Sequence, residues 1–263
     1  MKAAARLAPG RPSAAAPAAW AASDPYAAAL RSGHGPLFLR RTDGWLLPLD
    51  VERWCARADT VDLEVLDRCE GTVLDVGCGP GRLVAELAAR GRTVLGIDVS
   101  EAAVTRTVGL GGQSLRRSVF EPLPGEGRWD TVLLMDGNVG IGGDPRALLT
   151  RVAALLVPGG LLIAETAPVE VDERAEVQVV DVTDGHAADS PFPWARVGTR
   201  ALLRRAGAAG WRSAGQWTSG ERRFVALRSS RPASSSAEPP NSTAVVSSQR
   251  ARKPSADSPV TPA

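Results

Sequence analysis

The sequence predicts an α/β fold, a doubly wound sheet of about seven strands that is mostly parallel and has an antiparallel strand pair at its C-terminal end. Over most of the chain, short apolar runs typical of buried strands alternate with segments whose apolar residues recur every three or four positions, as in amphipathic helices. The run at 73–83 passes into a glycine-rich turn and then a helix. The last two runs, at 211–217 and 222–228, are separated by the tight turn TSGE, which predicts antiparallel pairing.

The stretch VLDVGCGPGRL at 73–83 is the centre of this prediction. Its apolar residues predict a strand interior, and Gly77, Gly79 and Gly81 let the backbone turn sharply and approach a ligand. The helix that begins near Pro80 or Gly81 directs its free N–H groups at the turn. We predict a ligand-binding cradle here, although a purely structural glycine turn is the alternative.

A carboxylate follows the next predicted strand. The helix RLVAELAAR ends at Gly91, and the strand TVLGID then ends in Asp98. An acid at the end of the second strand of a βαβ unit is placed to accept hydrogen bonds from ribose hydroxyl groups. The sequence therefore predicts a ligand that contains a nucleoside.

The spacing of the glycines separates two classes of nucleoside ligand. A dinucleotide-binding turn has the pattern G-x-G-x-x-G, whereas this chain has G-x-G-x-G, with Arg82 where the last glycine would fall. Asp75 stands just before the turn, where a carboxylate would repel a pyrophosphate and attract an ammonium group. The spacing disfavours a dinucleotide, and Asp75 favours a ligand with a cationic amino-acid end. An NAD-dependent oxidoreductase is the less favoured alternative.

These motifs resemble those of the class I S-adenosylmethionine-dependent methyltransferases with type 11 or type 12-like domains, whose first motif has the form VLDVGCGxG. The resemblance covers roughly Gly71 to Leu227. It implies a Rossmann-like fold, S-adenosyl-L-methionine as the cofactor and methyl transfer as the activity. The predicted cofactor-binding residues are Asp75, Gly77, Cys78, Gly79, Pro80, Gly81, Asp98, Val99, Val119, Phe120, Asp136, Gly137 and Asn138.

Two groups of these residues follow later strands. The predicted strand SLRRSVF ends at Val119 and Phe120, where the resemblance implies an adenine site, here with a backbone contact and an apolar wall. The family commonly has an acid at that place, and this chain has none. The buried run TVLLM ends in Asp136-Gly137-Asn138, at the same edge of the sheet as the first motif. The resemblance implies that this segment lies beside the reactive methyl group.

Less regular segments precede and follow this core. A hairpin is predicted at 37–49 around Asp43-Gly44, and a broken helical stretch from 51 with Asp59 or Thr60 as a cap and Gly71 as its end. The resemblance implies that these residues cover the active site, with Trp45, Trp54 and Asp59 as wall candidates; core packing is the alternative for both tryptophans. AEVQVVDV predicts a strand, DGHAADSPFPW a loop, and 196–210 a helix.

Composition bounds the organisation of the chain. We expect disordered tails at 1–23 (Ala/Pro-rich) and 229–263 (Ser/Pro-rich), a hairpin and helical cap at 24–70, and the methyltransferase domain at 71–228. Seven of the 31 basic and two of the 29 acidic residues lie in the tails, so the core is near neutral and no nucleic-acid partner is expected. Three cysteines without metal-ligand spacing predict free thiols, no metal site and the cytoplasm. The sequence contains no apolar run long enough for a membrane helix, so no membrane partner is expected, and it predicts no oligomeric state.

The acceptor and the catalytic base are the least determined features. The methyl group of a sulfonium is already activated, so the protein mainly aligns cofactor and acceptor and excludes water. A hydroxyl or protonated amine acceptor would also need a base, for which His186 and Asp136 are weak candidates. The chain lacks an Asn-Pro-Pro-aromatic motif after the fourth strand, so a small-molecule acceptor is predicted. A non-catalytic S-adenosylmethionine-binding protein is the second alternative.

Overall fold

The computed structural model describes residues 24–183 and 185–230, so the predicted tail at 1–23 and nearly all of the tail at 229–263 lie outside the described residues. The strands of the larger sheet are β3 (Val73–Val76), β4 (Val94–Asp98), β5 (Ser114–Arg116), β6 (Trp129–Leu134), β7 (Leu156–Thr166), β10 (Trp211–Ser219) and β11 (Arg222–Ser229). Those of the smaller sheet are β1 (Leu37–Arg41), β2 (Leu46–Leu49), β8 (Asp172–Asp181) and β9 (Phe192–Val197). The helices are α1 (Pro25–Ser32), α2 (Val51–Cys55), α3 (Thr60–Leu66), α4 (Arg82–Ala89), α5 (Glu101–Gly109), α6 (Pro145–Leu155), α7 (Thr199–Ala208) and the short 3-10 helix η2 (Asn138–Gly140).

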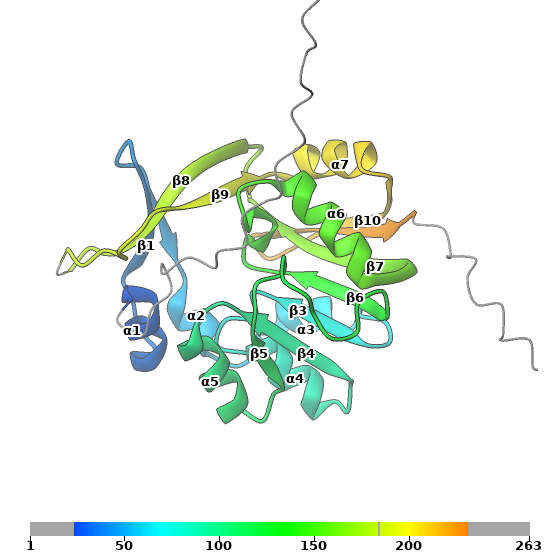
Figure 1. The fold of residues 1–263 in the computed structure, drawn as a ribbon, viewed down its shortest axis with the longest axis horizontal. Helices are drawn as coiled ribbons and strands as arrows, with labels where there is room; N and C mark the ends of the chain where they lie inside the picture. Colours follow the sequence, from blue (N-terminus) through cyan, green and yellow to red (C-terminus); the bar gives the residue numbers. More distant parts are fainter. Residues whose placement is uncertain (1–23, 184, 231–263) are drawn as a thin grey trace, which may run out of the picture. The chain divides into compact units, whose positions relative to one another are not determined.

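The larger sheet has the strand order β10-β11-β7-β6-β3-β4-β5 (Figure 1). Neighbours from β7 to β5 are parallel, whereas β11 runs antiparallel to both β7 and β10. The predicted fold is therefore confirmed, including the C-terminal antiparallel pair. β3 lies between β4 and β6, so the segments that follow those two strands flank the glycine-rich turn on opposite sides.

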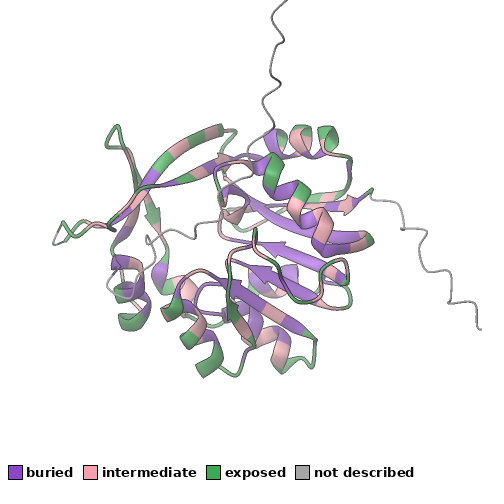
Figure 2. Ribbon diagram, viewed as in Figure 1, coloured by how far each residue is buried: buried purple, intermediate pink, exposed green. Residues whose placement is uncertain are grey.

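Helices cover both faces of this sheet. On one face Leu74 and Val76 pack with α6 and α7, and on the other Val73 packs with α3 and α4. The division follows from the alternation of side chains along β3, and it buries the central strands β3 and β6 on both sides (Figure 2). The sheet interior is closely packed, which fixes the positions of the loops at its carboxyl edge.

The smaller sheet joins two regions that are distant in sequence. The hairpin of β1 and β2 pairs antiparallel, and β1 also pairs with β8, in the order β2-β1-β8-β9. The prediction of a loop up to Trp194 and of a helix from Arg196 was wrong, because β9 occupies 192–197. Two prolines hide this strand in the sequence; Pro193 is tolerated because β9 is an edge strand, where a missing N–H leaves no ladder bond unmade.

Two predicted boundaries differ from the structure. The helix α3 ends at Leu66 rather than at Gly71, although Asp59 caps it as predicted, in a capping box with Asp62. The third strand, β5, ends at Arg116, because the Glu121 carboxylate accepts a hydrogen bond from the Ser118 N–H at 2.7 Å and turns the chain. In the part of the chain that the structure describes, no helix has both the length and the apolar composition needed to span a membrane.

Candidate active site

The three glycines of the turn between β3 and α4 have different surroundings. Gly77, Gly79 and Gly81 all have positive φ, at 71°, 54° and 90°. A Cβ on Gly77 would stand 2.5 Å from Asn138 Nδ2, and a Cβ on Gly81 would stand 2.4 Å from Thr107 Oγ1. A Cβ on Gly79 would meet only one atom, at the ordinary contact distance of 3.5 Å. Packing therefore requires Gly77 and Gly81, whereas Gly79 faces the space in which a ligand would approach the backbone.

Tyr26, the only tyrosine in the chain, covers this turn from α1. Its hydroxyl is the atom that a Cβ on Gly79 would meet, and its ring packs edge-on against Trp54, with centroids 6.4 Å apart. Burial, and then the nearby Asp98 carboxylate, raise the pKa of Tyr26 well above its usual value. The phenol therefore stays protonated and can donate a hydrogen bond over the turn.

Arg106 on α5 fastens the two N-terminal helices over the turn. Its Nη1 donates to the Leu30 carbonyl of α1 at 2.8 Å, and its Nη2 donates to the Cys55 carbonyl of α2 at 3.3 Å. Both carbonyls lie near helix C-terminal ends, where intrahelical donors are missing and a cation is favoured. One guanidinium group on α5 thus links both helices of this cover to the larger sheet's side of the turn.

Asp98 lies at the end of β4, beside the turn, as predicted for a ribose-binding acid. Its side chain accepts hydrogen bonds from the Gly79 N–H at 3.0 Å and from the Ser100 N–H at 2.8 Å. Burial raises the pKa of Asp98, and these backbone hydrogen bonds oppose the shift. A carboxylate offers about four lone-pair positions, so about half of its capacity remains for hydroxyl donors.

Asp136, which follows β6, is the centre of a buried cluster of charges. Its carboxylate accepts hydrogen bonds from Arg82 Nη1 at 2.8 Å and Arg53 Nη2 at 2.7 Å, and Arg222 Nη2 lies 3.7 Å away. Although burial raises the pKa of Asp136, the charges of Arg82 and Arg53 outweigh it and lower that pKa to about 2. A carboxylate held ionised by three guanidinium groups is a poor proton acceptor at neutral pH, so this geometry gives Asp136 an ion-pairing role.

Two further carboxylates complete the cluster. Arg82 Nε donates to Asp62 at 2.7 Å, and Arg222 binds both Asp62 and Glu165 at 2.8 Å. Asp62 is completely buried, and Arg82 is nearly so. We use the name ion-pair cluster for Arg53, Asp62, Arg82, Asp136, Glu165 and Arg222.

Asn138 ties the segment after β6 to the first motif. Its side-chain amide donates to the Val76 and Gly77 carbonyls, both at 2.9 Å. Gly137 precedes it with a φ of 82°, which lets the chain turn into η2. The segment Asp136-Gly137-Asn138 therefore lies against the glycine-rich turn, at the carboxyl edge of the sheet, as the sequence predicts.

Asp75 carries an orphaned polar atom just below the turn. The residue is 1% exposed, and its Oδ2 has no hydrogen-bond partner among the described residues. Burial is the main cause that raises the pKa of Asp75 to about 7. A buried acceptor left unpaired costs about 1–3 kcal/mol, and an ammonium donor would satisfy it. With Asp98 and the open face of Gly79, this atom fits a cofactor that has a ribose and a cationic amino-acid end.

The remaining predicted cofactor contacts have these positions. Cys78 and Pro80 are buried in the turn, and Val99 is half-buried after β4. Val119 is buried, but its carbonyl already accepts from Arg151 Nε at 2.7 Å, so that oxygen is committed within the protein. Phe120 is 44% exposed, and a Cβ on Gly142 would stand 2.7 Å from its ring. Phe120 thus packs on the loop that follows η2.

His186 is exposed in the loop that joins β8 and β9. Its backbone carbonyl accepts a hydrogen bond from the Asp181 N–H at 2.8 Å, and its side chain lies near Asp24, which caps α1. No contact with the turn is among the interactions described for it. The catalytic role of His186 stays a prediction.

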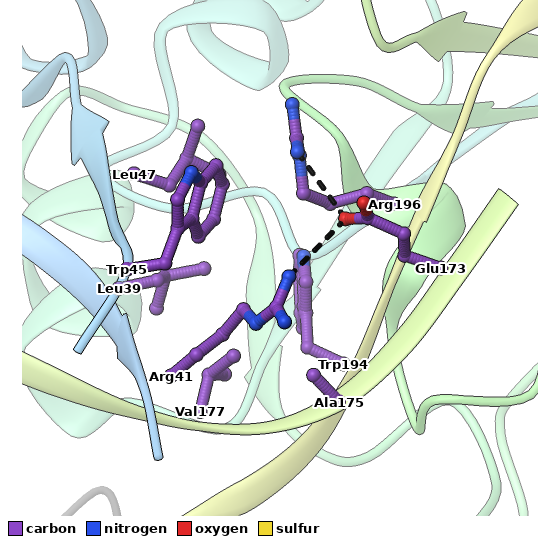
Figure 3. A pocket seen from close by; sticks show the side chains of 9 residues that line it. All are labelled: Leu39, Arg41, Trp45, Leu47, Glu173, Ala175, Val177, Trp194 and Arg196. Atoms are coloured by element: carbon purple, nitrogen blue, oxygen red, sulfur yellow. Dashed lines mark hydrogen bonds and ion pairs between the residues drawn. The ribbon is translucent and has the colours of Figure 1, made fainter. Parts of the chain in front are cut away.

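A pocket lies on one face of the smaller sheet, and we call it the aromatic pocket (Figure 3). It is lined by Leu39, Arg41, Trp45, Leu47, Glu173, Ala175, Val177, Trp194 and Arg196. The Arg196 guanidinium lies 4.5 Å from the centre of the Trp45 ring, and Glu173 pairs with Arg196 at 3.4 Å and with Arg41 at 3.7 Å. The pocket therefore has an apolar floor and a charged rim.

Trp194 connects this pocket to the larger sheet. A Cβ on Gly140, in η2, would stand 2.8 Å from Trp194 Nε1, and Ile141 forms a β-bridge with Trp194. The pocket consequently adjoins the segment that begins with Asp136. Of the predicted wall residues, Trp45 lines the pocket, Trp54 packs on Tyr26, and Asp59 caps α3.

Sequence reasoning missed Tyr26, Trp194 and five members of the ion-pair cluster. Arg82 could have been found, because an arginine directly after the glycine turn begins a helix at the edge of the crevice. Asp62 carried the signal of a capping box with Asp59. Nothing in the local sequence marks Arg222 or Glu165, which are brought together by the pairing of β11 with β7.

Comparison with known proteins agrees with this geometry. The family described as methyltransferase domain matches residues 51–211. A ubiquinone biosynthesis O-methyltransferase of Caulobacter sp. (strain K31) is 38% identical over 101 residues, which is 36% of this chain and 40% of that protein. A ribosomal RNA small subunit methyltransferase C of Alcanivorax borkumensis is 34% identical over 102 residues, 35% of this chain and 31% of that protein. The chain thus matches less than half the length of these curated relatives.

Among solved structures, a SAM-dependent methyltransferase from Bacteroides fragilis in complex with S-adenosyl-L-homocysteine has a TM-score of 0.65. It is 21% identical, and the superposition covers 80% of this chain and 95% of that one. At this identity the likeness supports the fold. The relatives have different acceptors in their names, so the comparisons leave the acceptor of this chain open.

Proposed function

We propose that this chain, which belongs to the methyltransferase domain family, transfers a methyl group from S-adenosyl-L-methionine to a small, largely apolar acceptor. The sulfonium of the cofactor supplies an activated methyl group when it is bound. The observation that carries the proposed acceptor class is the aromatic pocket, which adjoins η2 through Trp194. Sites for small molecules are concave and mostly apolar, and this pocket shares the apolar floor. Its volume is about 10 Å³, close to that of one water molecule, so the proposal requires the pocket to widen when an acceptor binds.

Different residues of the chain bind the cofactor, cover it and orient the acceptor. Asp98 accepts the ribose hydroxyl groups, and Gly79 lets the backbone approach the cofactor. Tyr26 and Trp54 cover the turn and exclude water from it. The indole rings of Trp45 and Trp194 present flat apolar surface to the acceptor. Alignment of the two substrates with exclusion of water is the main contribution that a protein can make to this reaction.

Hydroxyl-bearing aromatic acceptors are the first class to test. Several curated relatives are named as ubiquinone biosynthesis O-methyltransferases, although this chain matches about 40% of the length of the Caulobacter protein. Transfer to a hydroxyl needs a proton acceptor, and the ion-paired Asp136 is unsuited to it. His186 is the remaining predicted base. We also propose a cytoplasmic location, which the free thiols of Cys55, Cys69 and Cys78 support.

The test is transfer of label from methyl-labelled S-adenosylmethionine by the full chain. It would be offered an organic extract of small metabolites, total RNA and unfolded protein in separate reactions. We expect label in the organic extract. Label in RNA or protein instead would overturn the small-molecule acceptor, and tight cofactor binding with no transfer to any fraction would support the non-catalytic alternative.

A pocket variant tests the acceptor site itself. Trp194→Ala removes aromatic surface from the pocket, so we expect a raised KM for the extract component and an unchanged affinity for S-adenosylhomocysteine. Trp217→Phe is the matched control, because that ring stacks on Phe224 at the C-terminal strand pair. Equal effects of both changes on transfer would remove the pocket from the proposal.

A further inference from the structure

Arg196, on the rim of the aromatic pocket, has a guanidinium group that its neighbours pair only weakly. Its side chain is 20% exposed, and the hydrogen bond described for it goes from Nη1 to Glu173 Oε2 at 3.4 Å. Hydrogen bonds between a guanidinium and a carboxylate are normally about 2.7–2.9 Å long, and a guanidinium has several N–H donors. Among the described residues, most of the hydrogen-bonding capacity of this half-buried cation is therefore unused.

Arg41, the second cation of the pocket, has a closer partner. Its Nη2 donates to Asp43 Oδ2 at 2.6 Å, whereas its Nη1 lies 3.7 Å from Glu173. Asp43 also accepts a hydrogen bond from the Trp45 N–H at 3.2 Å, so this carboxylate fixes Arg41 to the hairpin turn. Of the two guanidinium groups, that of Arg196 is therefore the one available to a ligand.

The residues that line the aromatic pocket carry a net positive charge. Arg41 and Arg196 are cations, and Glu173 is the single carboxylate of the lining; Figure 3 shows it between the two guanidinium groups. The two guanidinium groups also share one aromatic ring, since they lie 5.7 Å and 4.5 Å from the centre of Trp45. Two like charges so close to one apolar wall favour the entry of a further anion.

A larger cavity, of about 330 Å³, adjoins the aromatic pocket and has the same sign of charge. It shares Arg41 and Val177 with the pocket, and its other charged lining residues are Arg40 and Glu176. The partner described for the Arg40 side chain is the neutral amide of Gln178, to which it donates at 3.0 Å. An acceptor that approaches the pocket from this cavity would meet an excess of positive charge.

Arg196 and Trp194 give the pocket two different ends. Arg196 follows Trp194 by two positions on β9, so their side chains share one face and lie about 6.6 Å apart along the strand. Trp194 is the residue that adjoins η2, whereas Arg196 is paired across the strands with Glu173. This spacing suits one planar ring with its reacting group toward η2 and an anionic group at the opposite end.

We propose that the acceptor is an aromatic compound with a carboxylate group, and that Arg196 binds this carboxylate while the ring lies against Trp194. The carboxylate of Glu173, between Arg196 and Arg41, marks the position that the acceptor's carboxylate would occupy. This proposal rests on the proposed function, because it names the acceptor class of the same site. The competing role of Arg196 is structural, as a support for the Trp45 ring.

Displacement of Glu173 would also widen the pocket. The side chain of Glu173 is 43% exposed, so it can turn into solvent when another carboxylate takes its place. Ion pairs as exposed as those of Glu173 contribute little to stability, so their loss opposes binding only weakly. The same movement thus gives the ring of the acceptor more room and leaves Arg196 free to bind it.

Calorimetry with two probes tests the proposal. The first probe, 4-hydroxybenzoate, carries a carboxylate, and the second, 4-hydroxybenzamide, has the same ring and hydroxyl group with a neutral amide of similar shape. Each would be titrated into the full chain in the presence of saturating S-adenosylhomocysteine, whose own binding is measured first. We expect the benzoate to bind roughly ten-fold more tightly than the benzamide, because its hydrogen bond to Arg196 joins two charged groups.

Two variants should change this preference in opposite directions. Arg196→Gln should abolish it and leave the affinity for the benzamide within about two-fold of the parent, because only the interaction with the carboxylate is lost. Glu173→Gln should increase it, because it removes the negative charge that competes for Arg196. Arg41→Gln is the matched control: it removes the same charge from the same pocket, but from a side chain held by Asp43, so the preference should fall less.

The outcomes distinguish this proposal from the proposed function. Equal affinity of the parent chain for the two probes, or binding of neither, would overturn the proposal while S-adenosylhomocysteine still binds. Equal weakening of both probes by Arg196→Gln, or a preference that Glu173→Gln leaves unchanged or lowers, would show a structural role and overturn it as well. Failure of the parent chain to bind S-adenosylhomocysteine would instead overturn the cofactor assignment.

Discussion

Arg82 donates two hydrogen bonds to Asp136, at 2.8 Å and 3.2 Å, and so joins the start of α4 to the end of β6. The same guanidinium donates to Asp62 at 2.7 Å and 3.2 Å. It therefore connects three segments around the glycine turn, and its own side chain is only 3% exposed. Because this charged group makes four such hydrogen bonds, we expect Arg82 to stabilise the fold, although it lies in a ligand-binding motif.

Arg82→Ala should lower the free energy of unfolding by about 3–5 kcal/mol, because it leaves buried carboxylates without their main partner. Urea unfolding of the full chain measures this. Arg204→Ala is the control, since its pair with Asp172 is exposed at the surface and should contribute about 0–1 kcal/mol. A decrease for Arg82→Ala no larger than that of the control would show that the ion-pair cluster is not structural.

Substitutions of the glycines in the turn should have different effects, on stability at one position and on cofactor affinity at another. Gly81→Ala places a methyl group 2.4 Å from Thr107 Oγ1, so we expect it to destabilise the fold strongly. In Gly79→Ala the added methyl group meets only the Tyr26 hydroxyl, at 3.5 Å. We therefore expect the free energy of unfolding to fall by roughly 1–2 kcal/mol, the cost of a left-handed conformation for a residue other than glycine. We also expect the affinity for S-adenosylhomocysteine to fall.

Gly44→Ala isolates the conformational cost. Gly44 has a φ of 87° in the hairpin turn, and nothing lies within 4 Å of an added Cβ. Thermal melts and cofactor titrations of the three variants give the comparison. Unchanged cofactor affinity in Gly79→Ala would mean that this glycine does not face the cofactor.

The larger sheet was predictable from the sequence because its signals are local. Buried strands, glycine stops and Asp-Pro caps fix elements within a few residues, and the order of α/β elements then leaves few ways to form a sheet. Asp98 and Asn138 reach the crevice for the same reason, since the carboxyl ends of parallel strands share one edge.

The smaller sheet and the ion-pair cluster were not predictable in this way. Leu37 pairs with Asp181, and Arg222 binds Asp62, contacts that join residues more than a hundred positions apart. Neither the periodicity of apolar residues nor the helix-capping residues predict such long-range pairs. Tyr26 was missed for the same reason, because its role depends on where α1 packs on α5 and not on the residues beside it.

Arg106→Ala should release the cover over the cofactor site. The variant removes both hydrogen bonds that fasten α1 and α2 to α5, so we expect S-adenosylhomocysteine to dissociate roughly ten-fold faster while the sheet stays folded. Stopped-flow measurement of dissociation gives the rate. Arg31→Ala, an exposed change on α1, is the control, and equal rates in both variants would show that Arg106 does not hold the cover.

The raised pKa of Asp75 predicts how stability depends on pH. Burial raises the pKa of this carboxyl group to about 7 in the folded protein, from an ordinary value of 3.8. Between these values the folded state holds a proton that the unfolded state has released, so the contribution of Asp75 to stability falls as pH rises through this window. Below it both states are protonated, and above it both are ionised.

Asp75→Asn isolates that contribution, because the amide resembles the protonated acid and does not titrate. Measured without cofactor, the melting temperature of Asp75→Asn should rise relative to the parent as pH increases from about 4 to about 7, and the difference should level off above about 7. Comparison with the parent at each pH cancels the contribution of other titrating groups, such as Asp24, whose pKa is also raised, to about 6.

Saturating S-adenosylhomocysteine should then reduce the difference in melting temperature between Asp75→Asn and the parent above about pH 7, since its ammonium group stabilises the ionised carboxylate of the parent. A difference that stays constant over this whole range of pH would mean that Asp75 does not hold a proton in the folded state, and its orphaned oxygen would need another explanation.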